Sequence, residues 1–258
     1  MKTGISITFL GTGTSQGIPV IGSKHPVCLS SDSRDKRLRV SVLLEWGEKN
    51  YVIDCGPDFR QQMLREEVTQ LNGVLLTHEH SDHTAGIDDI RPFYFKQGDI
   101  PFYASSRVFE SLQLRFAYIF ETVNKYPGAP TITQNIVSKD MTFQLNNKTV
   151  IPVEAMHATL PVLGYKIDGF VYLTDVKTIS EAEILKIENC DVLVVNALRI
   201  EPHQSHFNLD EALQFVKRVN PKKAYFTHIS HVLGFHKEVE NQLPENVHLA
   251  YDGLKIKL

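Results

Sequence analysis

Cysteine is scarce in this sequence: the 258 residues contain only Cys28, Cys55 and Cys190. Three cysteines do not make the disulfide framework of a small secreted domain, so a reducing compartment is the simpler interpretation. The segment from Met1 to Leu10 is also too short and polar for a signal peptide, and no small-residue cleavage site follows it. We therefore expect a cytoplasmic protein.

Long apolar runs and a strong net charge are absent as well. No stretch approaches the roughly 18 apolar residues that a membrane span needs. The formal net charge of −3 gives no support to a nucleic-acid groove. Hydrophobic residues make up 42% of the chain, which can therefore bury a sizeable core, and its length suits a single domain over residues 1–258. These features favour a soluble protein without a membrane or nucleic-acid partner.

What the sequence does contain is a dense group of metal-binding side chains after one apolar segment. Residues 74–76 predict a buried strand, and His78, His80, Asp82 and His83 follow it closely. His78 and His80 are two residues apart, so in an extended chain they point to the same side. Four ligand-type side chains at this density favour a metal site over a polar loop.

Three later segments repeat the pattern of an apolar strand that ends at a metal-binding residue. Residues 151–156 lead to His157, residues 171–174 to Asp175, and residues 224–227 to His228. Side chains at the ends of strands far apart in sequence can build one site in a fold of strands and helices. Seven such side chains exceed the four groups that one zinc ion takes. They suit two metals about 3.5–4 Å apart with a carboxylate between them.

The motif H-x-H-x-D-H at residues 78–83, with the three strand-end residues that follow, resembles the metallo-β-lactamase superfamily over nearly the whole chain. The resemblance implies an α/β fold, the αββα sandwich, with the site at one edge of two facing sheets. It implies that Asp54 supports the metal loop without binding metal. It also divides the ligands into two groups with one shared carboxylate: His78, His80 and His157 for one metal, Asp82, His83 and His228 for the other, and Asp175 as the bridge.

Two segments are similar to a narrower group, the phosphoribosyl 1,2-cyclic phosphate phosphodiesterases of phosphonate breakdown. That group carries a structural zinc, held by three cysteines in an early loop and by the second histidine of a T-H-x-S-H motif, which is His231 here. In this chain Ser23 and His25 stand where two of the cysteines are expected, and only Cys28 remains. His25, Cys28 and His231 could supply three zinc ligands, with a fourth from elsewhere. Alternatively, the zinc site is lost and packing holds the loop.

The narrower group also places a catalytic histidine that is not a ligand in a loop before a helix. Asn208 and Glu211 have the spacing of a capping box, so a helix should begin just after His206. His206 fits the catalytic position, His203 is the alternative, and an exposed loop histidine is the non-functional interpretation. Two divalent ions, Mn²⁺ or Zn²⁺, would lower the pKa of a shared water so that hydroxide can attack a small cyclic phosphodiester. His206 would protonate the leaving oxygen, and Asp82 is a catalytic candidate as well as a ligand.

Other functions remain open at this point. A tRNA 3′-processing nuclease has the same metal motif, but the chain has no long Gly- or Lys-rich arm to hold RNA. A thioester or lactam hydrolase of the same fold is a further alternative. A non-catalytic binding module should have lost ligands, yet all seven are present. Residues 106–121 are rich in aromatic residues and leucine, which indicates either core or the surface of a homodimer.

Residues 30–39 carry several positive charges. This segment is either a solvated loop or a cationic rim that attracts a phosphate group. Its basic residues are Arg34, Lys36, Arg37 and Arg39.

Overall fold

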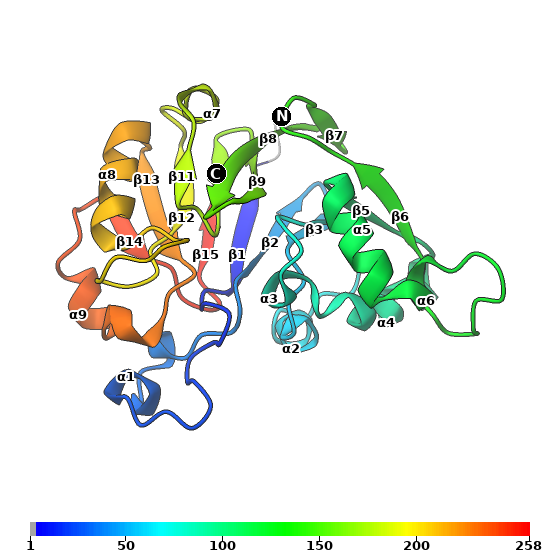
Figure 1. Cartoon of the computed structure of the whole chain (residues 1–258), viewed down its shortest axis with the longest axis horizontal. Helices are drawn as coiled ribbons and strands as arrows, with labels where there is room; N and C mark the ends of the chain where they lie inside the picture. The colour runs from blue at the N-terminus through cyan, green and yellow to red at the C-terminus, as the bar shows by residue number, and fades with distance from the viewer. Residues whose placement is uncertain (1–3) are drawn as a thin grey trace.

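Two β-sheets face each other in the computed structural model, which describes residues 4–258 (Figure 1). In spatial order, the seven strands of the first sheet are β15 (Lys255–Lys257), β1 (Ser6–Gly11), β2 (Ser41–Trp46), β3 (Lys49–Ile53), β4 (Gly73–Leu75), β5 (Ile100–Ala104) and β6 (Ile132–Ile136). The second sheet runs through β11 (Thr178–Ile179), β8 (Lys148–His157), β9 (Leu160–Ile167), β10 (Phe170–Tyr172), β12 (Val192–Asn196), β13 (Lys223–Thr227) and β14 (Val247–Leu249), with β7 (Phe143–Leu145) paired to β8.

Helices cover the outer face of each sheet (Figure 1). The first sheet carries α2 (Phe59–Arg65), α4 (Arg91–Gln97) and α5 (Ser106–Arg115), while α7 (Glu181–Leu185), α8 (Leu209–Val219) and α9 (His236–Glu240) pack on the second. The shorter helices are α1 (Pro26–Leu29), α3 (Ser81–Thr84), α6 (Ala117–Phe120) and the 3₁₀ turns η1 (Ser33–Asp35), η2 (Ile87–Ile90) and η3 (His231–Leu233). Among residues 4–258, every helix falls short of the length or the apolar content that a membrane crossing demands.

The layers follow from the two-residue period of the strands. In β2, Val42 and Leu44 face the core between the sheets, whereas Leu43 packs under the helices of the first sheet. In β12, Val192 faces the same inner core and Leu193 packs under the helices of the second sheet. Because successive side chains point to opposite faces, an unbroken apolar strand can fill both cores. The predicted αββα sandwich is confirmed.

Positive φ angles set two element boundaries in the first half of the chain. Helix α2 ends at Arg65, because Glu67 has a left-handed backbone (φ 52°) and the Val68 amide donates to the Met63 carbonyl at 3.0 Å. The turn between β2 and β3 is tight, since Gly47 and Glu48 both have positive φ and the next strand starts at Lys49. This pair of positive φ angles matches the two-residue turn whose twist suits a hairpin.

The basic residues of the 30–39 segment do not form a cationic rim. Arg34 pairs with Asp32 at 2.7 Å, and Arg39 pairs with Asp58 at 3.0 Å. Arg37 is buried, and its Nη1 donates to the Thr12 hydroxyl at 2.8 Å. Arg37 and Arg39 hold the early loop to the rest of the chain, and Arg34 is paired within the loop, so these guanidinium groups are not free to attract a phosphate. The buried Arg37 fits neither of the two alternatives for this segment, the solvated loop and the cationic rim.

The apolar residues of the 106–121 segment are partly buried and partly exposed. Val108, Phe109 and Leu112 of α5 are buried in the layer between α5 and the first sheet, together with Ile119 of α6. Leu114 is exposed. The core interpretation therefore accounts for the four buried residues, while Phe116, Tyr118 and Phe120 are only partly buried.

Candidate metal centre

The strands that end in metal-binding residues bring those residues to one edge of the sandwich. His78 follows β4 of the first sheet, while His157 ends β8, Asp175 follows β10 and His228 follows β13 of the second. The two sheets are joined just here: the Leu163 amide donates to the Thr77 carbonyl at 3.0 Å, beside the first ligand. The predicted site is thus assembled from both sheets.

Three histidines gather on one side of this edge. The ring centroids of His78 and His80 are 4.6 Å apart, those of His80 and His157 are 5.2 Å apart, and those of His78 and His157 are 5.8 Å apart. His78 and His157 are buried. These are the three residues that the family resemblance assigns to one metal.

The second group surrounds His83. Its Nε2 lies 3.2 Å from Asp82 Oδ2 and 3.3 Å from Asp175 Oδ2. His228 Nε2 lies 3.6 Å from Asp82 Oδ2 and 3.3 Å from Asp175 Oδ1. The ligand atoms of Asp82, His83 and His228 lie within 4.8 Å of one another, and so do those of His78, His83 and Asp175. Asp175 therefore sits where a carboxylate can be shared between the two groups.

The donor set fits divalent metal ions. His83 Nε2 and both ring nitrogens of His228 are buried and make no hydrogen bond with any residue from 4 to 258. A buried imidazole nitrogen without a partner is costly, and a metal ion is the partner that this cluster of imidazoles and carboxylates would hold. The structure thus supports a metal site, with His and Asp as its ligands.

Electrostatics at the cluster point the same way. Burial opposes a charge on His83, but Asp82, Asp175 and Asp54 together raise its pKa well above the ordinary value. Burial likewise opposes ionisation of Asp175, yet His228 and His83 hold its pKa well below the usual range. The carboxylates therefore create a site that favours positive charge, which a proton or a metal ion can supply.

Supporting hydrogen bonds orient the ligands from behind. Asp54 Oδ2 lies 2.7 Å from His83 Nδ1, and the same carboxylate accepts from the Thr77 amide and hydroxyl at 2.8 and 2.9 Å. His157 Nδ1 lies 2.8 Å from the Ser205 carbonyl, to which it can donate. Holding Nδ1 in this way leaves Nε2 of each ring for a metal.

Left-handed backbone recurs among the residues of the site. Asp54, Asp175 and His228 have φ angles of 64°, 58° and 53°. Asp54 and His228 directly follow β3 and β13, and Asp175 lies three residues after the end of β10, so the chain turns sharply near each strand end. Residues with side chains adopt this conformation at a steric cost, and such residues cluster at functional sites.

His206 lies against the shared carboxylate. Its Nε2 is 2.9 Å from Asp175 Oδ1, and its ring stacks on His228 with centroids 4.9 Å apart. Burial lowers the pKa of His206 to about 4. The helix that follows begins as predicted, with Asn208 and Glu211 forming a capping box. His203, the alternative candidate, is one step further out, with its Nδ1 3.1 Å from His206 Nδ1.

Two of the three candidate ligands of a structural zinc lie side by side, and His231 Nδ1 is buried without a hydrogen-bond partner among residues 4–258. The rings of His25 and His231 meet edge to face at 5.0 Å. However, His25 Nδ1 accepts from the Val27 amide at 3.3 Å, and Cys28 Sγ accepts from the Val20 amide at 3.5 Å. Within residues 4–258, the groups whose ligand atoms come within 4.8 Å of one another include neither this trio nor the trio of His78, His80 and His157.

Two supporting residues were missed in the sequence. Arg115 of α5 donates to the Glu79 carbonyl at 2.9 Å and to the Thr84 hydroxyl at 2.7 Å, and so holds the loop between His78 and α3. Ser205 acts on His157 through its backbone carbonyl. Neither could be found in the sequence, because Arg115 lies in a distant amphipathic helix and a carbonyl group has no residue signature.

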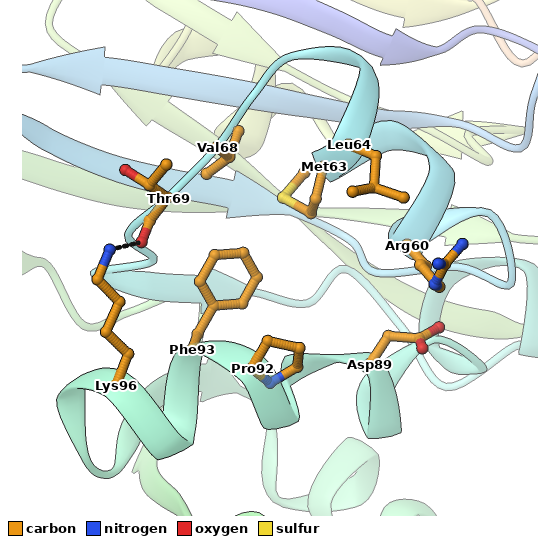
Figure 2. A pocket seen from close by; sticks show the side chains of 9 residues that line it. All are labelled: Arg60, Met63, Leu64, Val68, Thr69, Asp89, Pro92, Phe93 and Lys96. Carbon is orange, nitrogen blue, oxygen red and sulfur yellow. Dashed lines mark hydrogen bonds between the residues drawn. The ribbon is translucent and has the colours of Figure 1, made fainter.

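An apolar pocket of about 400 Å³ lies elsewhere, between α2 and α4 (Figure 2). Met63, Phe93 and Val68 form its floor, with Arg60 and Lys96 at opposite ends of the rim. None of the predicted metal ligands lines it. The chemistry is therefore expected at the strand-end cluster and not in this pocket.

Comparison with known proteins agrees with this geometry. A family model described as "Beta-lactamase superfamily domain" matches residues 49–229, a range that holds every predicted ligand of the strand-end cluster. The chain belongs to this superfamily. The predicted family is confirmed, and the fold and the cluster together confirm a metal-dependent hydrolase domain.

Individual relatives of this superfamily domain carry different names. A solved structure described as a new diphosphatase from the PhnP family is 36% identical, with a TM-score of 0.92 over 99% of this chain and 97% of that one. An octanoyltransferase of Porphyromonas gingivalis is 40% identical over 95% of this chain, which spans only 50% of that protein. A ribonuclease Z of Listeria monocytogenes is 24% identical, over 96% of this chain and 97% of that protein.

Proposed function

We propose that this domain is a phosphodiesterase that uses two divalent metal ions to cleave a small, cyclic phosphodiester such as 5-phosphoribosyl 1,2-cyclic phosphate. The observation that carries the proposal is the position of Asp175, which lies 3.3 Å from both His83 and His228 and 2.9 Å from His206. A carboxylate placed between two groups of ligands, with a further histidine against it, suits phosphoryl chemistry at a pair of metals.

The ligands of one metal would be His78, His80 and His157, and those of the other Asp82, His83 and His228, with Asp175 shared. When bound, the ions would supply a water of lowered pKa and would stabilise the charge that develops on the phosphoryl oxygens. Mixed imidazole and carboxylate ligands suit manganese or zinc.

The chain's own groups would supply orientation and a proton. Asp54 and the Ser205 carbonyl hold Nδ1 of His83 and His157, so that the opposite ring nitrogens are fixed in direction. His206, which touches Asp175, would lie beside the phosphoryl group and protonate the leaving oxygen, because the Asp175 carboxylate raises the pKa of His206 against the effect of burial. The buried setting of these side chains keeps bulk water away from the reacting groups.

The similarity to a PhnP-family diphosphatase supports the phosphoryl part of this proposal, because that protein matches 99% of the chain at 36% identity. The name octanoyltransferase supports it less, since the chain spans half of that protein and its acyl chemistry can reside in the other half. The ribonuclease Z similarity favours tRNA 3′-processing as a second candidate. Against RNA stands the net charge of −3, together with the pairing of Arg34 and Arg39 with carboxylates.

The test is turnover by manganese-loaded protein of three substrates: 5-phosphoribosyl 1,2-cyclic phosphate, bis(p-nitrophenyl) phosphate and a tRNA precursor with a 3′ trailer. We expect the cyclic ester to have much the highest kcat/KM. Cleavage of the generic diester alone would place the true substrate among other phosphodiesters. Preference for the tRNA would overturn the small-molecule assignment. Asp175→Asn should lose metal and activity together, which separates the site from a contaminating enzyme.

A further inference from the structure

A second pocket, of about 430 Å³, lies directly beside the metal centre. It shares residues with the site: the Ser205 carbonyl is 2.8 Å from His157 Nδ1, and His203 Nδ1 is 3.1 Å from His206 Nδ1. The pocket residues Ser205 and His203 are therefore in direct contact with His157 and His206, two of the groups that would act on the phosphodiester. The residues that line it are Ala158, Arg199, Pro202, His203, Gln204 and Ser205.

We propose that this pocket binds a second phosphate group of the substrate. This inference rests on the proposed function and deepens it, because it names the residues that would recognise the 5-phosphate of a substrate such as 5-phosphoribosyl 1,2-cyclic phosphate. Arg199 would be the main determinant of specificity, with His203 and Ser205 as further hydrogen-bond donors. None of the six lining residues is acidic, so the pocket presents donors and a positive charge to its contents.

Arg199 is held in a way that suits anion binding. Its Nε donates to the Glu201 carbonyl at 3.1 Å, and its Nη2 donates to the Pro202 carbonyl at 2.7 Å. Two hydrogen bonds to backbone carbonyls fix the guanidinium but leave its charge unbalanced. Its Nη1 makes no hydrogen bond with any residue from 4 to 258, and Arg199 is one of the residues that line the pocket. A planar, preorganised guanidinium of this kind is well matched to a phosphate group.

Most other arginines near the surface contrast with Arg199. Each of the following has a carboxylate within 4.0 Å: Arg34, Arg39, Arg65, Arg91, Arg107 and Arg218. Arg199 has no such partner in the described part of the chain. A cation without a carboxylate partner, next to a centre that handles phosphate, has its counter-ion supplied by the ligand.

The pocket suits a small molecule better than a polymer. It is a single hollow with one arginine, whereas a nucleic acid is held by a row of cations along its backbone. Its volume accommodates a phosphate group with part of a sugar. A sugar phosphate that also carries the scissile phosphodiester would therefore occupy both the pocket and the metal centre.

Direct binding tests the pocket without relying on turnover. Ribose 5-phosphate and ribose are titrated into metal-loaded protein by calorimetry, with the wild type, Arg199→Gln, His203→Gln and the control Arg60→Gln. Arg60 is an exposed arginine on the rim of the pocket in Figure 2, and it does not line the proposed phosphate pocket. We expect ribose 5-phosphate to bind the wild type and Arg60→Gln equally, and about 10- to 100-fold more weakly to Arg199→Gln, because a hydrogen bond to a charged group is lost.

Equal binding of ribose 5-phosphate to the wild type and to both pocket variants would overturn the proposal. Binding of ribose as tight as that of ribose 5-phosphate would overturn it too, since the phosphate would then contribute nothing. His203→Gln gives an independent reading if Arg199→Gln fails to fold, which circular dichroism would reveal.

A kinetic comparison separates the pocket from the proposed function. Ribose 1,2-cyclic phosphate is compared with and without its 5-phosphate, and Arg199→Gln should lower kcat/KM about 10- to 100-fold more for the phosphorylated ester. An equal loss for both esters would show that Arg199 merely supports the loop, and would overturn the pocket. If neither ester is cleaved but ribose 5-phosphate binding depends on Arg199, the proposed function fails while the pocket stands.

Discussion

Asp54 Oδ2 lies 2.7 Å from His83 Nδ1, and both side chains are fully buried. The same carboxylate accepts hydrogen bonds from the amide and hydroxyl of Thr77, the residue that precedes the first histidine of the motif. One residue at the end of β3 thus fixes both the start of the metal loop and one of its ligands. The direction of His83 Nε2 depends on a residue that would not itself touch a metal.

Replacement of Asp54 by Asn should weaken metal binding. The amide can still contact Thr77 but cannot stabilise charge on His83, so we expect affinity for the ions to fall about 10- to 100-fold. Competition with a metal chelator measures this. Asp191→Asn is the matched control, because that carboxylate is half-exposed and pairs with Lys222 on the surface. Unaltered affinity in Asp54→Asn would show that the hydrogen bond to His83 does not support the metal site.

Replacement of His206 by Ala should separate catalysis from metal binding. If His206 protonates the leaving oxygen, kcat should fall about 10²- to 10⁴-fold while the metal content stays normal. Metal analysis and steady-state kinetics on the cleaved diester test both statements, with His248→Ala as a control histidine outside the site. Loss of metal would make His206 a ligand, and unchanged kcat with normal metal content would remove it from the mechanism.

The metal content of the purified protein should be two ions per chain. Asp82, His83 and His228 bring their ligand atoms within 4.8 Å of one another, and so do His78, His83 and Asp175. The hydrogen bonds from the Val27 and Val20 amides occupy His25 and Cys28. Elemental analysis of the wild type and Cys28→Ser should therefore give the same count. Three ions in the wild type and two in the variant would show that Cys28 is a ligand of a structural zinc ion.

His236 should make stability depend on pH. Burial, with the nearby charges of Arg37 and Arg34, lowers its pKa to about 4, while Glu240 and Asp32 act in the opposite sense. The unfolded chain takes up a proton near pH 6.5 and the folded chain only near pH 4, so the free energy of unfolding falls as pH falls between these values. We expect a loss of about 2 kcal/mol from pH 7.5 to pH 5.0.

Urea unfolding of the wild type and His236→Gln at the two pH values isolates this contribution. The Gln side chain can still accept from Arg37, whose Nη2 lies 3.1 Å from His236 Nδ1, but it does not titrate. The variant should therefore lose less stability on acidification than the wild type. An identical loss in both proteins would mean that His236 is not the group responsible.

The sequence predicted the ligand set because the ligands follow apolar strands, and strand ends gather at one edge of a sheet. The family resemblance added the αββα arrangement, which no spacing reveals. The burial of Arg37 could not be predicted, because it depends on Thr12, Ala250 and His236 meeting around it in space. The early end of α2 was equally hidden, since the left-handed backbone at Glu67 breaks a run that otherwise looks helical. The contacts of Arg115 and Ser205 likewise arise only once the sheets have packed.

The left-handed backbone at Asp54, Asp175 and His228 has a steric cost that lowers the stability of the fold at the points where the chemistry is expected. Glycine would adopt these angles without the steric clash that a histidine side chain brings, yet it would leave nothing to bind a metal. Folding and metal binding therefore favour different residues at the same strand ends. His228→Gly would lose a metal ligand but would also relieve the backbone strain at this position. Thermal stability alone is therefore a poor guide to whether the metal site is intact.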